Sequence, residues 1–195
     1  MMSKLSRENL MNLETYAAER ADFRARVMSH KKNRQLLLGD HCTLYFEDTL
    51  TIQYQVQEML RIERIFEADG INEELEAYNP LIPDGCNWKA TFMIEYVDVA
   101  ERQAALEKML GIEDKVWMQV ADFDRIYAIA DEDLERSDDT KTSAVHFMRF
   151  ELTPEMANAV KGGASISAGI DHPAYTTSVE PLLAPTRDSL AADLA

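Results

Sequence analysis

The sequence has few cysteines, no long hydrophobic run and fewer basic than acidic residues, and each shortage excludes a class of protein. Its two cysteines, Cys42 and Cys86, match neither a disulfide scaffold nor a zinc motif, so we expect two reduced thiols. No hydrophobic run approaches the ~20 residues that cross a bilayer, and the N-terminus has no hydrophobic stretch of the signal-peptide type. The sequence therefore predicts a cytoplasmic protein.

Sequence motifs of the common enzyme classes are also missing. The chain contains no Gly-x-Gly-x-x-Gly, no P-loop, no Gly-x-Ser-x-Gly and no His-Glu-x-x-His, which argues against dinucleotide binding, NTP hydrolysis, serine hydrolysis and zinc proteolysis. Glu-x-x-His, the helical ligand pattern of ferritin-like di-iron proteins, is missing as well. Any catalytic activity would therefore depend on residues outside these motifs, and the residues alone indicate neither a cofactor nor a metal.

Charge is unbalanced and unevenly distributed along the chain. The 195 residues include 20 Lys and Arg against 35 Asp and Glu, a net charge of −15, which disfavours binding to nucleic acids and to anionic membranes. Residues 1–39 carry eight basic and four acidic side chains and hence +4, so the remainder carries −19. We expect this basic segment to lie over the acidic part of its own fold or of a second subunit, with docking to an acidic partner protein as the alternative.

Hydrophobic spacing predicts helices in the first part of the chain and mostly strands in the second. Helices are expected from Ser6 to Ala17, over residues 21–31 and over residues 49–69, the last one ending before Gly70. Strands are expected at residues 36–38 and 43–46, and again from Lys89 onward, where apolar and polar residues alternate.

We therefore expect a single α+β domain over residues 1–195, with an antiparallel sheet packed against a long central helix and N-terminal helices. Residues 1–34 would form a helical, basic N-terminal arm, and residues 35–195 an acidic α+β body. No internal repeat or low-complexity linker divides the chain.

The helix expected over residues 49–69 places a carboxylate on its apolar face. Ile52, Val56, Met59 and Phe66 recur at helical spacing, and the position that completes this stripe is Glu63. A buried carboxylate must be paired, hydrogen-bonded, metal-bound or protonated. A salt bridge to an arginine of another element is the simpler expectation, and binding of a ligand or metal is the alternative.

Polar residues on a neighbouring face of this helix form a second stripe, which consists of Gln53, Gln57, Arg61 and Arg64. Amide and guanidinium groups are donors that suit an anion. The loop that starts at Asn79 contains two prolines and a Pro-Asp-Gly turn, and we expect an ordered surface loop with a function there.

Further candidates lie in the second half of the chain. His146 is expected on an apolar strand face, where a hydrogen-bonded core histidine is a simpler interpretation than a ligand. Arg149 points to the opposite face of that strand, where it could bind a carboxylate. His172 lies in an Asp-His-Pro turn that could orient its ring, although Asp and His are common turn residues.

Several stretches of the sequence also carry a family resemblance. They are residues 30–34, 46–48, 54–65, 78–83, 141–147 and 171–175, among which Gln-Glu-Met-Leu-Arg-Ile-Glu-Arg at 57–64 is the most specific. Together they resemble the uncharacterised bacterial family catalogued as domain of unknown function 3501, over nearly the whole chain. The resemblance implies no established activity, cofactor or catalytic residue. Genes of that family often neighbour those of rubrerythrin-like proteins and iron-sulfur oxidoreductases, which implies a role in peroxide or redox defence.

The leading hypothesis is therefore a cytosolic, oligomeric accessory protein that binds a redox partner or a small anionic ligand. The partner would be a rubrerythrin-like or iron-sulfur protein, and Arg61, Arg64 and Arg149 would contact an anion. The chemically distinctive residues would converge in one polar pocket under the long helix. They are Glu63 with Gln57, Arg61 and Arg64 beside it, the loop from Asn79, His146 and His172.

Two other hypotheses stay open. One is an enzyme or metalloprotein in which Glu63 and His146, together with His172 or Glu58, supply acid–base groups or metal ligands. The other is a structural homodimer whose basic arm embraces the acidic body of a second subunit.

Overall fold

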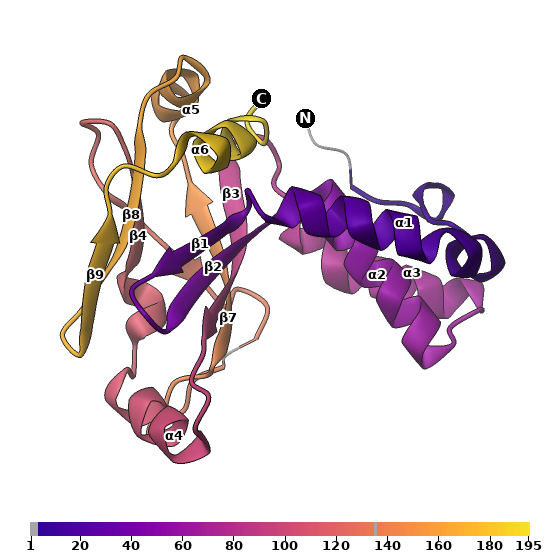
Figure 1. Cartoon of the computed structure of the whole chain (residues 1–195), viewed down its shortest axis with the longest axis horizontal. Helices are drawn as coiled ribbons and strands as arrows, with labels where there is room; N and C mark the ends of the chain where they lie inside the picture. Colours follow the sequence, from indigo (N-terminus) through magenta and orange to yellow (C-terminus); the bar gives the residue numbers. More distant parts are fainter. Residues whose placement is uncertain (1–3, 135) are drawn as a thin grey trace.

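The computed structural model describes residues 4–134 and 136–195. Its main parts are two antiparallel sheets and a group of three helices that projects from them (Figure 1). The larger sheet has the strand order β1-β2-β3-β7-β6, and the smaller one β5-β4-β8-β9. The strands are β1 (Gln35–Leu38), β2 (Cys42–Glu47), β3 (Asn87–Ile94), β4 (Val116–Val120), β5 (Ile126–Tyr127), β6 (Ile129–Ala130), β7 (Val145–Glu151), β8 (Ile166–His172) and β9 (Tyr175–Val179). This arrangement confirms the α+β class and the antiparallel sheet.

The helices are α1 (Leu13–Lys31), α2 (Thr49–Glu63), α3 (Ala68–Tyr78), α4 (Val99–Lys108), α5 (Pro154–Lys161) and α6 (Ala184–Ala191). Short 3-10 helices occupy η1 (Arg7–Asn9), η2 (Asn79–Leu81) and η3 (Ile112–Lys115). None of the described helices combines the length and the hydrophobicity that a membrane-spanning helix requires.

The main core lies between the two sheets, because alternate residues of their strands point inward. Trp88 and Phe92 of β3, Met118 of β4 and Ile170 of β8 are all buried in this one cluster. Residues 90, 92 and 94 had been expected on a buried strand face, and their burial confirms it.

Tyr175 joins the smaller sheet to the turn between β1 and β2. Its hydroxyl donates to the Leu38 carbonyl (2.8 Å) and accepts from the His41 amide (2.9 Å). Gly39 in this turn has a φ of +69°, and a Cβ there would lie 2.5 Å from the Tyr175 hydroxyl. The turn therefore needs glycine, both for its left-handed backbone and for the close approach of the ring.

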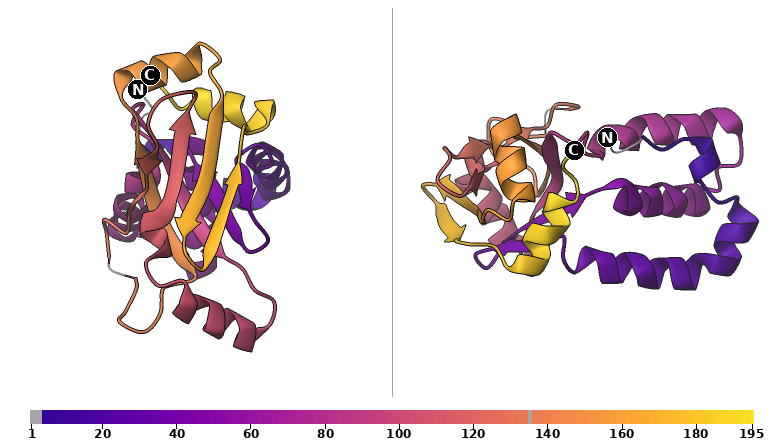
Figure 2. Two further views of the ribbon diagram at one scale, coloured as in Figure 1. Left: turned by 90° about the vertical axis from the view of Figure 1, so that its left-hand side faces the viewer. Right: turned by 90° about the horizontal axis from the view of Figure 1, so that it is seen from above.

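Helices α1, α2 and α3 form a layer that projects from the sheets, with α2 in the middle (Figure 2). We call these helices, with the N-terminal residues 4–12, the helical arm. The arm thus extends beyond the predicted residues 1–34, because α2 and α3 belong to it rather than to the acidic body. Its interior consists of two apolar clusters, one around Ile52, Val56 and Leu60, the other around Tyr16 and Phe23.

Two predicted helix boundaries in the arm were wrong. Residues 13–31 form one helix, which starts where the Asn12 side chain accepts from the Thr15 amide (2.8 Å), whereas Ser6 precedes only a 3-10 turn. The helix expected over residues 49–69 ends at Glu63, because Arg64 adopts a left-handed conformation (φ 56°) and the Ile65 amide bonds back to the Leu60 carbonyl (3.0 Å). This cap turns Ile65 into the apolar cluster, and the chain restarts as α3.

The acidic neighbours of the basic N-terminal segment are helices α2 and α3 of the same chain. Residues 49–78 carry seven acidic and two basic side chains, a charge of −5 that offsets the +4 of residues 1–39. The Arg20 guanidinium forms a two-pronged ion pair with Glu58 (2.7 and 2.9 Å), and the Tyr16 hydroxyl donates to the same carboxylate (2.5 Å). The arm is therefore nearly neutral, and the remaining residues carry the acidic charge.

The Glu58 ion pair should make the arm sensitive to acid. Hydrogen bonds from Arg20, and then from Tyr16 and Arg61, lower the pKa of Glu58 from 4.5 to about 2, although burial opposes this. Because the folded-state pKa is the lower one, the stabilisation is complete above pH 4.5 and is lost as pH falls towards 2. It amounts to about 1–2 kcal/mol once the solvent exposure of Arg20 is allowed for.

Urea unfolding of the wild type and of Glu58→Gln at pH 7 and pH 3 would test this. The wild type should lose more stability between the two pH values than Glu58→Gln does, and the exposed Glu14→Gln should behave like the wild type. An equal loss in the wild type and Glu58→Gln would contradict the prediction.

Arg34 ties the start of the larger sheet to helix α6. Its side chain is 2% exposed and forms a two-pronged ion pair with Asp193 (2.6 and 3.1 Å). It also donates to the carbonyls of Phe46 (3.0 Å) and Glu47 (2.9 Å) at the end of β2. Burial raises the pKa of Asp193 to about 6, against the opposing effect of Arg34.

Candidate functional site

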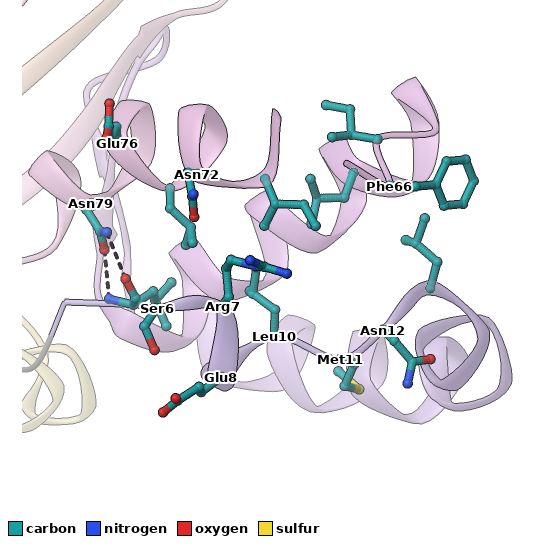
Figure 3. A pocket seen from close by; sticks show the side chains of 16 residues that line it. Ser6, Arg7, Glu8, Leu10, Met11, Asn12, Phe66, Asn72, Glu76 and Asn79 are labelled. Carbon is teal, nitrogen blue, oxygen red and sulfur yellow. Dashed lines mark hydrogen bonds between the residues drawn. The ribbon is translucent and has the colours of Figure 1, made fainter. Parts of the chain in front are cut away.

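A cavity of about 1010 Å³ lies in the helical arm, between residues 4–12 and the helices α2 and α3 (Figure 3). We call residues 4–12 the strap and the cavity the arm pocket. Its lining is mainly aliphatic and aromatic: Leu5, Leu10, Met11, Leu13, Leu60, Ile65, Phe66, Ile71 and Leu75. Phe66 stands at one end of the pocket and remains 68% exposed. A large, open and mostly apolar pocket is typical of a small-molecule binding site.

Amide side chains hold the strap at both ends. The Asn79 carboxamide accepts from the Leu5 amide (2.8 Å) and donates to the Leu5 carbonyl (2.9 Å). Gln57 makes the same pair of bonds with Met11 (2.6 and 3.2 Å), and Gln53 donates to the Asn9 carbonyl (2.6 Å). A carboxamide has the same donor and acceptor groups as a peptide bond. Each of these side chains therefore bonds to backbone groups of the strap in the way that a neighbouring backbone segment would. The strap is thereby fixed across the pocket.

Arg7 is the cation of the arm pocket. Figure 3 shows its side chain extending from the strap into the space before α2 and α3, whereas the carboxylate of Glu8 points away. Within residues 4–134 and 136–195, no carboxylate pairs with the Arg7 guanidinium and no hydrogen bond engages it. The pocket therefore combines a mainly apolar lining, with Glu76 among its polar members, and one unpaired positive charge on the exposed Arg7.

The three charged candidates at the end of α2 face solvent instead of a pocket. Glu63 is exposed, because the helix ends at this residue and the expected apolar stripe does not continue to it. Arg61 is 41% exposed at its side chain and bonds to Glu58 (3.2 Å), and Arg64 is the exposed left-handed cap. The expectation of a buried Glu63 on an apolar stripe was wrong, and its cause is the early end of the helix.

His146 is fully buried in the body, far along the chain from the arm, and each of its ring nitrogens has hydrogen-bond partners. Nδ1 lies 2.6 Å from Asp131 Oδ2, while Nε2 lies 2.9 Å from the Thr142 hydroxyl and 3.1 Å from the Ser143 carbonyl. It is a core histidine, the simpler of the two interpretations offered by the sequence.

These hydrogen bonds define which atoms of the cluster carry protons. The hydroxyls of Ser137 and Thr142 donate to the two oxygens of Glu113 (2.5 and 2.9 Å). Thr142 can then only accept from His146, as the Ser143 carbonyl must, so Nε2 is a donor. Nδ1 lies 2.6 Å from the Asp131 carboxylate, so the ring bridges Thr142 and Asp131. Although burial opposes it, the hydrogen bonds from Ser137 and Thr142 lower the pKa of Glu113.

The remaining two candidates are also engaged within the fold. His172 is buried at the β8–β9 turn, where Nε2 donates to the Leu110 carbonyl (3.1 Å) and Nδ1 accepts from the Ala174 amide (3.2 Å). Arg149 lies on the outer face of β7, as expected, and binds Glu132 through two bonds of 2.8 Å and Glu151 through one of 2.5 Å. The side chains of His172 and Arg149 thus form their hydrogen bonds and ion pairs within the chain.

The structure does not bring the sequence candidates together. Gln57 and Asn79 hold the strap of the arm pocket, whereas His146 and His172 lie in the body. In the described part of the chain, no three His, Cys, Asp or Glu side chains are grouped so that they could hold a metal ion. Arg7 did not emerge from the sequence, although an isolated cation between the apolar Leu5 and Leu10 was a usable signal.

Comparisons with known proteins agree on family and fold. The family model described as "Protein of unknown function (DUF3501)" matches residues 4–194, which confirms the resemblance found in the sequence. The chain is also similar to a solved structure of a protein of unknown function from Burkholderia pseudomallei K96243. The two share 51% sequence identity and a TM-score of 0.94, over 99% of this chain and 100% of that chain. No curated protein matches.

Proposed function

The chain belongs to the DUF3501 family of proteins of unknown function, and from the arm pocket we propose that it binds an amphipathic anion, an alkyl chain with a carboxylate head group. The observation that carries this proposal is the unpaired guanidinium of Arg7 beside the apolar side chains of a pocket whose lining is mainly apolar. This proposal keeps the sequence-based hypothesis of an anionic ligand, but Arg7 takes the place of Arg61, Arg64 and Arg149 as the residue that contacts the anion.

The size and lining of the pocket favour a ligand with a long apolar part. Its volume of about 1010 Å³ reaches the upper end of the range for small-molecule sites. Each methylene group that leaves water contributes about 0.8 kcal/mol, and the exposed ring of Phe66 would be covered at the same time. An alkyl chain therefore accounts for the hydrophobic lining better than a compact, polar anion would.

The head group is assigned by Arg7. A guanidinium forms two parallel hydrogen bonds with a carboxylate, and such a charge-assisted bond contributes about 1.5–3 kcal/mol. The strap, fixed by Asn79 at one end and Gln57 at the other, holds Arg7 over the pocket without the ligand.

Calorimetric titration with dodecanoate tests the proposal. We expect Arg7→Leu to bind dodecanoate about 10- to 100-fold more weakly than the wild type, in line with the loss of one charge-assisted contact. Dodecanol should bind the wild type and Arg7→Leu equally, because it has no charge for Arg7 to recognise. Arg24→Leu, which removes an exposed arginine of α1 outside the pocket, is the matched control and should leave the affinity within about twofold.

Two results would refute the proposal: no binding of dodecanoate by the wild type, or equal binding by wild type and Arg7→Leu. Titration with a third ligand, dodecyl phosphate, compares the affinities for two head groups. A site for carboxylates should bind dodecanoate more tightly than dodecyl phosphate. An accessory role beside a rubrerythrin-like or iron-sulfur protein, and an oligomeric state, stay predictions from the sequence.

A further inference from the structure

A second hollow lies where the arm meets the outer face of the larger sheet. Two cavities of about 430 and 520 Å³ share Tyr78, Leu81 and Phe147 in their linings, so they adjoin each other. We call the combined hollow the corner groove. It is separate from the arm pocket, since the two have no lining residue in common.

Lys89 stands in the wall of the corner groove, on the outer face of β3. Its side chain is half-buried, and its ammonium group donates to the Pro80 carbonyl. The strand register places it directly opposite Arg149 on β7 and Glu47 on β2. Side chains that face each other across two strands are close neighbours, so two cations lie side by side at this point of the sheet.

Both its burial and its neighbours weaken the positive charge of Lys89. Desolvation lowers the pKa of Lys89, and Arg149 and Lys4 act in the same direction, against Asp84 and Glu132. A lysine that is desolvated, or placed next to another cation, has more free amine at neutral pH and is the usual form of nucleophilic lysine.

From this geometry we propose that Lys89 is a nucleophilic amine, which forms an imine with a small aldehyde or ketone bound in the corner groove. The Lys89 nitrogen attacks the carbonyl carbon, and the carbinolamine that results loses water. A C=N bond replaces the C=O bond, and the two amine hydrogens leave with the oxygen as water. No oxidant or reductant takes part, and the reaction is reversible.

Other residues of the groove suit this reaction. Tyr78, Leu81 and Phe147 offer an apolar surface for the carbon chain of the carbonyl compound and exclude water from the imine. Glu74 lines the same cavity, and burial, together with the charges of Glu63 and Glu73, raises its pKa. A carboxyl group that holds its proton more tightly can pass it to the departing hydroxyl group.

Reductive alkylation tests the proposal. The intact protein is treated at pH 7 with hexanal and cyanoborohydride, which reduces an imine to a stable amine, and the eight lysines are compared by peptide mapping. We expect Lys89 to react faster than the exposed Lys108, Lys115 and Lys161, since a lowered pKa leaves more free amine at pH 7. A Lys89 rate at or below that of these three would overturn the proposal.

A comparison of formaldehyde with hexanal distinguishes the reactivity of the Lys89 amine from the contribution of binding in the groove. The preference for Lys89 should be larger with hexanal, whose chain can contact Leu81 and Phe147. Equal preference with both aldehydes would show a reactive lysine without a binding site and would overturn the assignment of the groove.

Two variants that remove opposite charges beside Lys89 test whether electrostatics causes its reactivity. Arg149→Met removes the adjacent cation and should slow alkylation of Lys89, whereas Glu132→Gln removes a carboxylate and should accelerate it. Arg24→Met, on α1, is the control and should leave the rate unchanged. Thermal unfolding of each variant checks that it folds, and changes of the same sign in both variants would contradict the proposal. The test depends on neither Arg7 nor the strap, so it is independent of the function proposed for the arm pocket.

Discussion

Replacement of His146 by alanine should destabilise the protein by about 3–5 kcal/mol, because it leaves a cavity at a fully buried position and removes the hydrogen-bond partner of Asp131 and Thr142. The ring lies between Asp131, 2.6 Å from Nδ1, and Glu113, whose Oε2 lies 3.9 Å from Nε2. These groups come from η3, from the segment after β6 and from β7, so the loss would loosen several parts of the body together. Denaturant unfolding at pH 7 measures the effect.

Two controls make this result specific. Thr142→Val removes the hydroxyl that bonds to Glu113 and His146 but leaves the His146 ring in place, and should destabilise the protein by about 1–3 kcal/mol. His41→Ala removes a half-exposed histidine that stacks on Tyr96 and should have a smaller effect than His146→Ala. NMR of the His146 ring should show a hydrogen on Nε2. A ring without that hydrogen, or a loss of stability below about 1 kcal/mol in His146→Ala, would contradict the hydrogen-bond assignment.

Replacement of Arg34 by methionine should also destabilise the protein by about 3–5 kcal/mol, because it strands the buried carboxylate of Asp193. The pKa of Asp193 is about 6 with Arg34 present and should rise further without it. Because a raised folded-state pKa favours folding as pH falls, protonation relieves part of the loss below that pKa. The difference between wild type and Arg34→Met should therefore be larger at pH 8 than at pH 5.

The double variant Arg34→Met/Asp193→Asn provides the decisive comparison. It carries no buried charge at either position, so it should be more stable than Arg34→Met alone at pH 8. Arg187→Met removes an arginine of helix α6 that, among the described residues, pairs with the adjacent Asp188 alone, and it should stay within about 0.5 kcal/mol of the wild type. If the double variant were no more stable than Arg34→Met, the buried charge would not be the cause.

Local patterns predicted the strands well, because a period of two is visible over a few residues. The strand pair at residues 36–38 and 43–46 is confirmed as β1 and β2, and the strand of His146 and Arg149 has the expected two faces. The single helix α1 was missed, although Tyr16, Phe23 and Val27 lie seven and four residues apart and mark one continuous face. Ser6, a favoured N-cap residue, had suggested a separate and earlier helix.

The arm pocket could not be predicted, because contacts between distant residues create it. Asn79 meets Leu5 across 74 positions of the chain, and Gln57 meets Met11 across 46. The sequence showed a row of polar side chains on α2, and an anion was one use for it. In the structure Gln53 and Gln57 bind the backbone of the strap instead, because a carboxamide can bond to backbone groups as well as to an anion. Spacing along one helix does not distinguish anion binding from backbone binding.

The distance along the chain between Arg34 and Asp193 also has a consequence for biosynthesis. The two residues are 159 positions apart. A ribosome that has made β1, β2 and Asp48, whose carboxylate lies 3.3 Å from Arg34 Nε, has yet to make the carboxylate that forms the two-pronged ion pair. Until the segment after helix α6 emerges, a guanidinium that ends up 2% exposed lacks this partner. The sheets of the nascent chain should therefore close around Arg34 late, after translation of the last helix, and not progressively from the N-terminus.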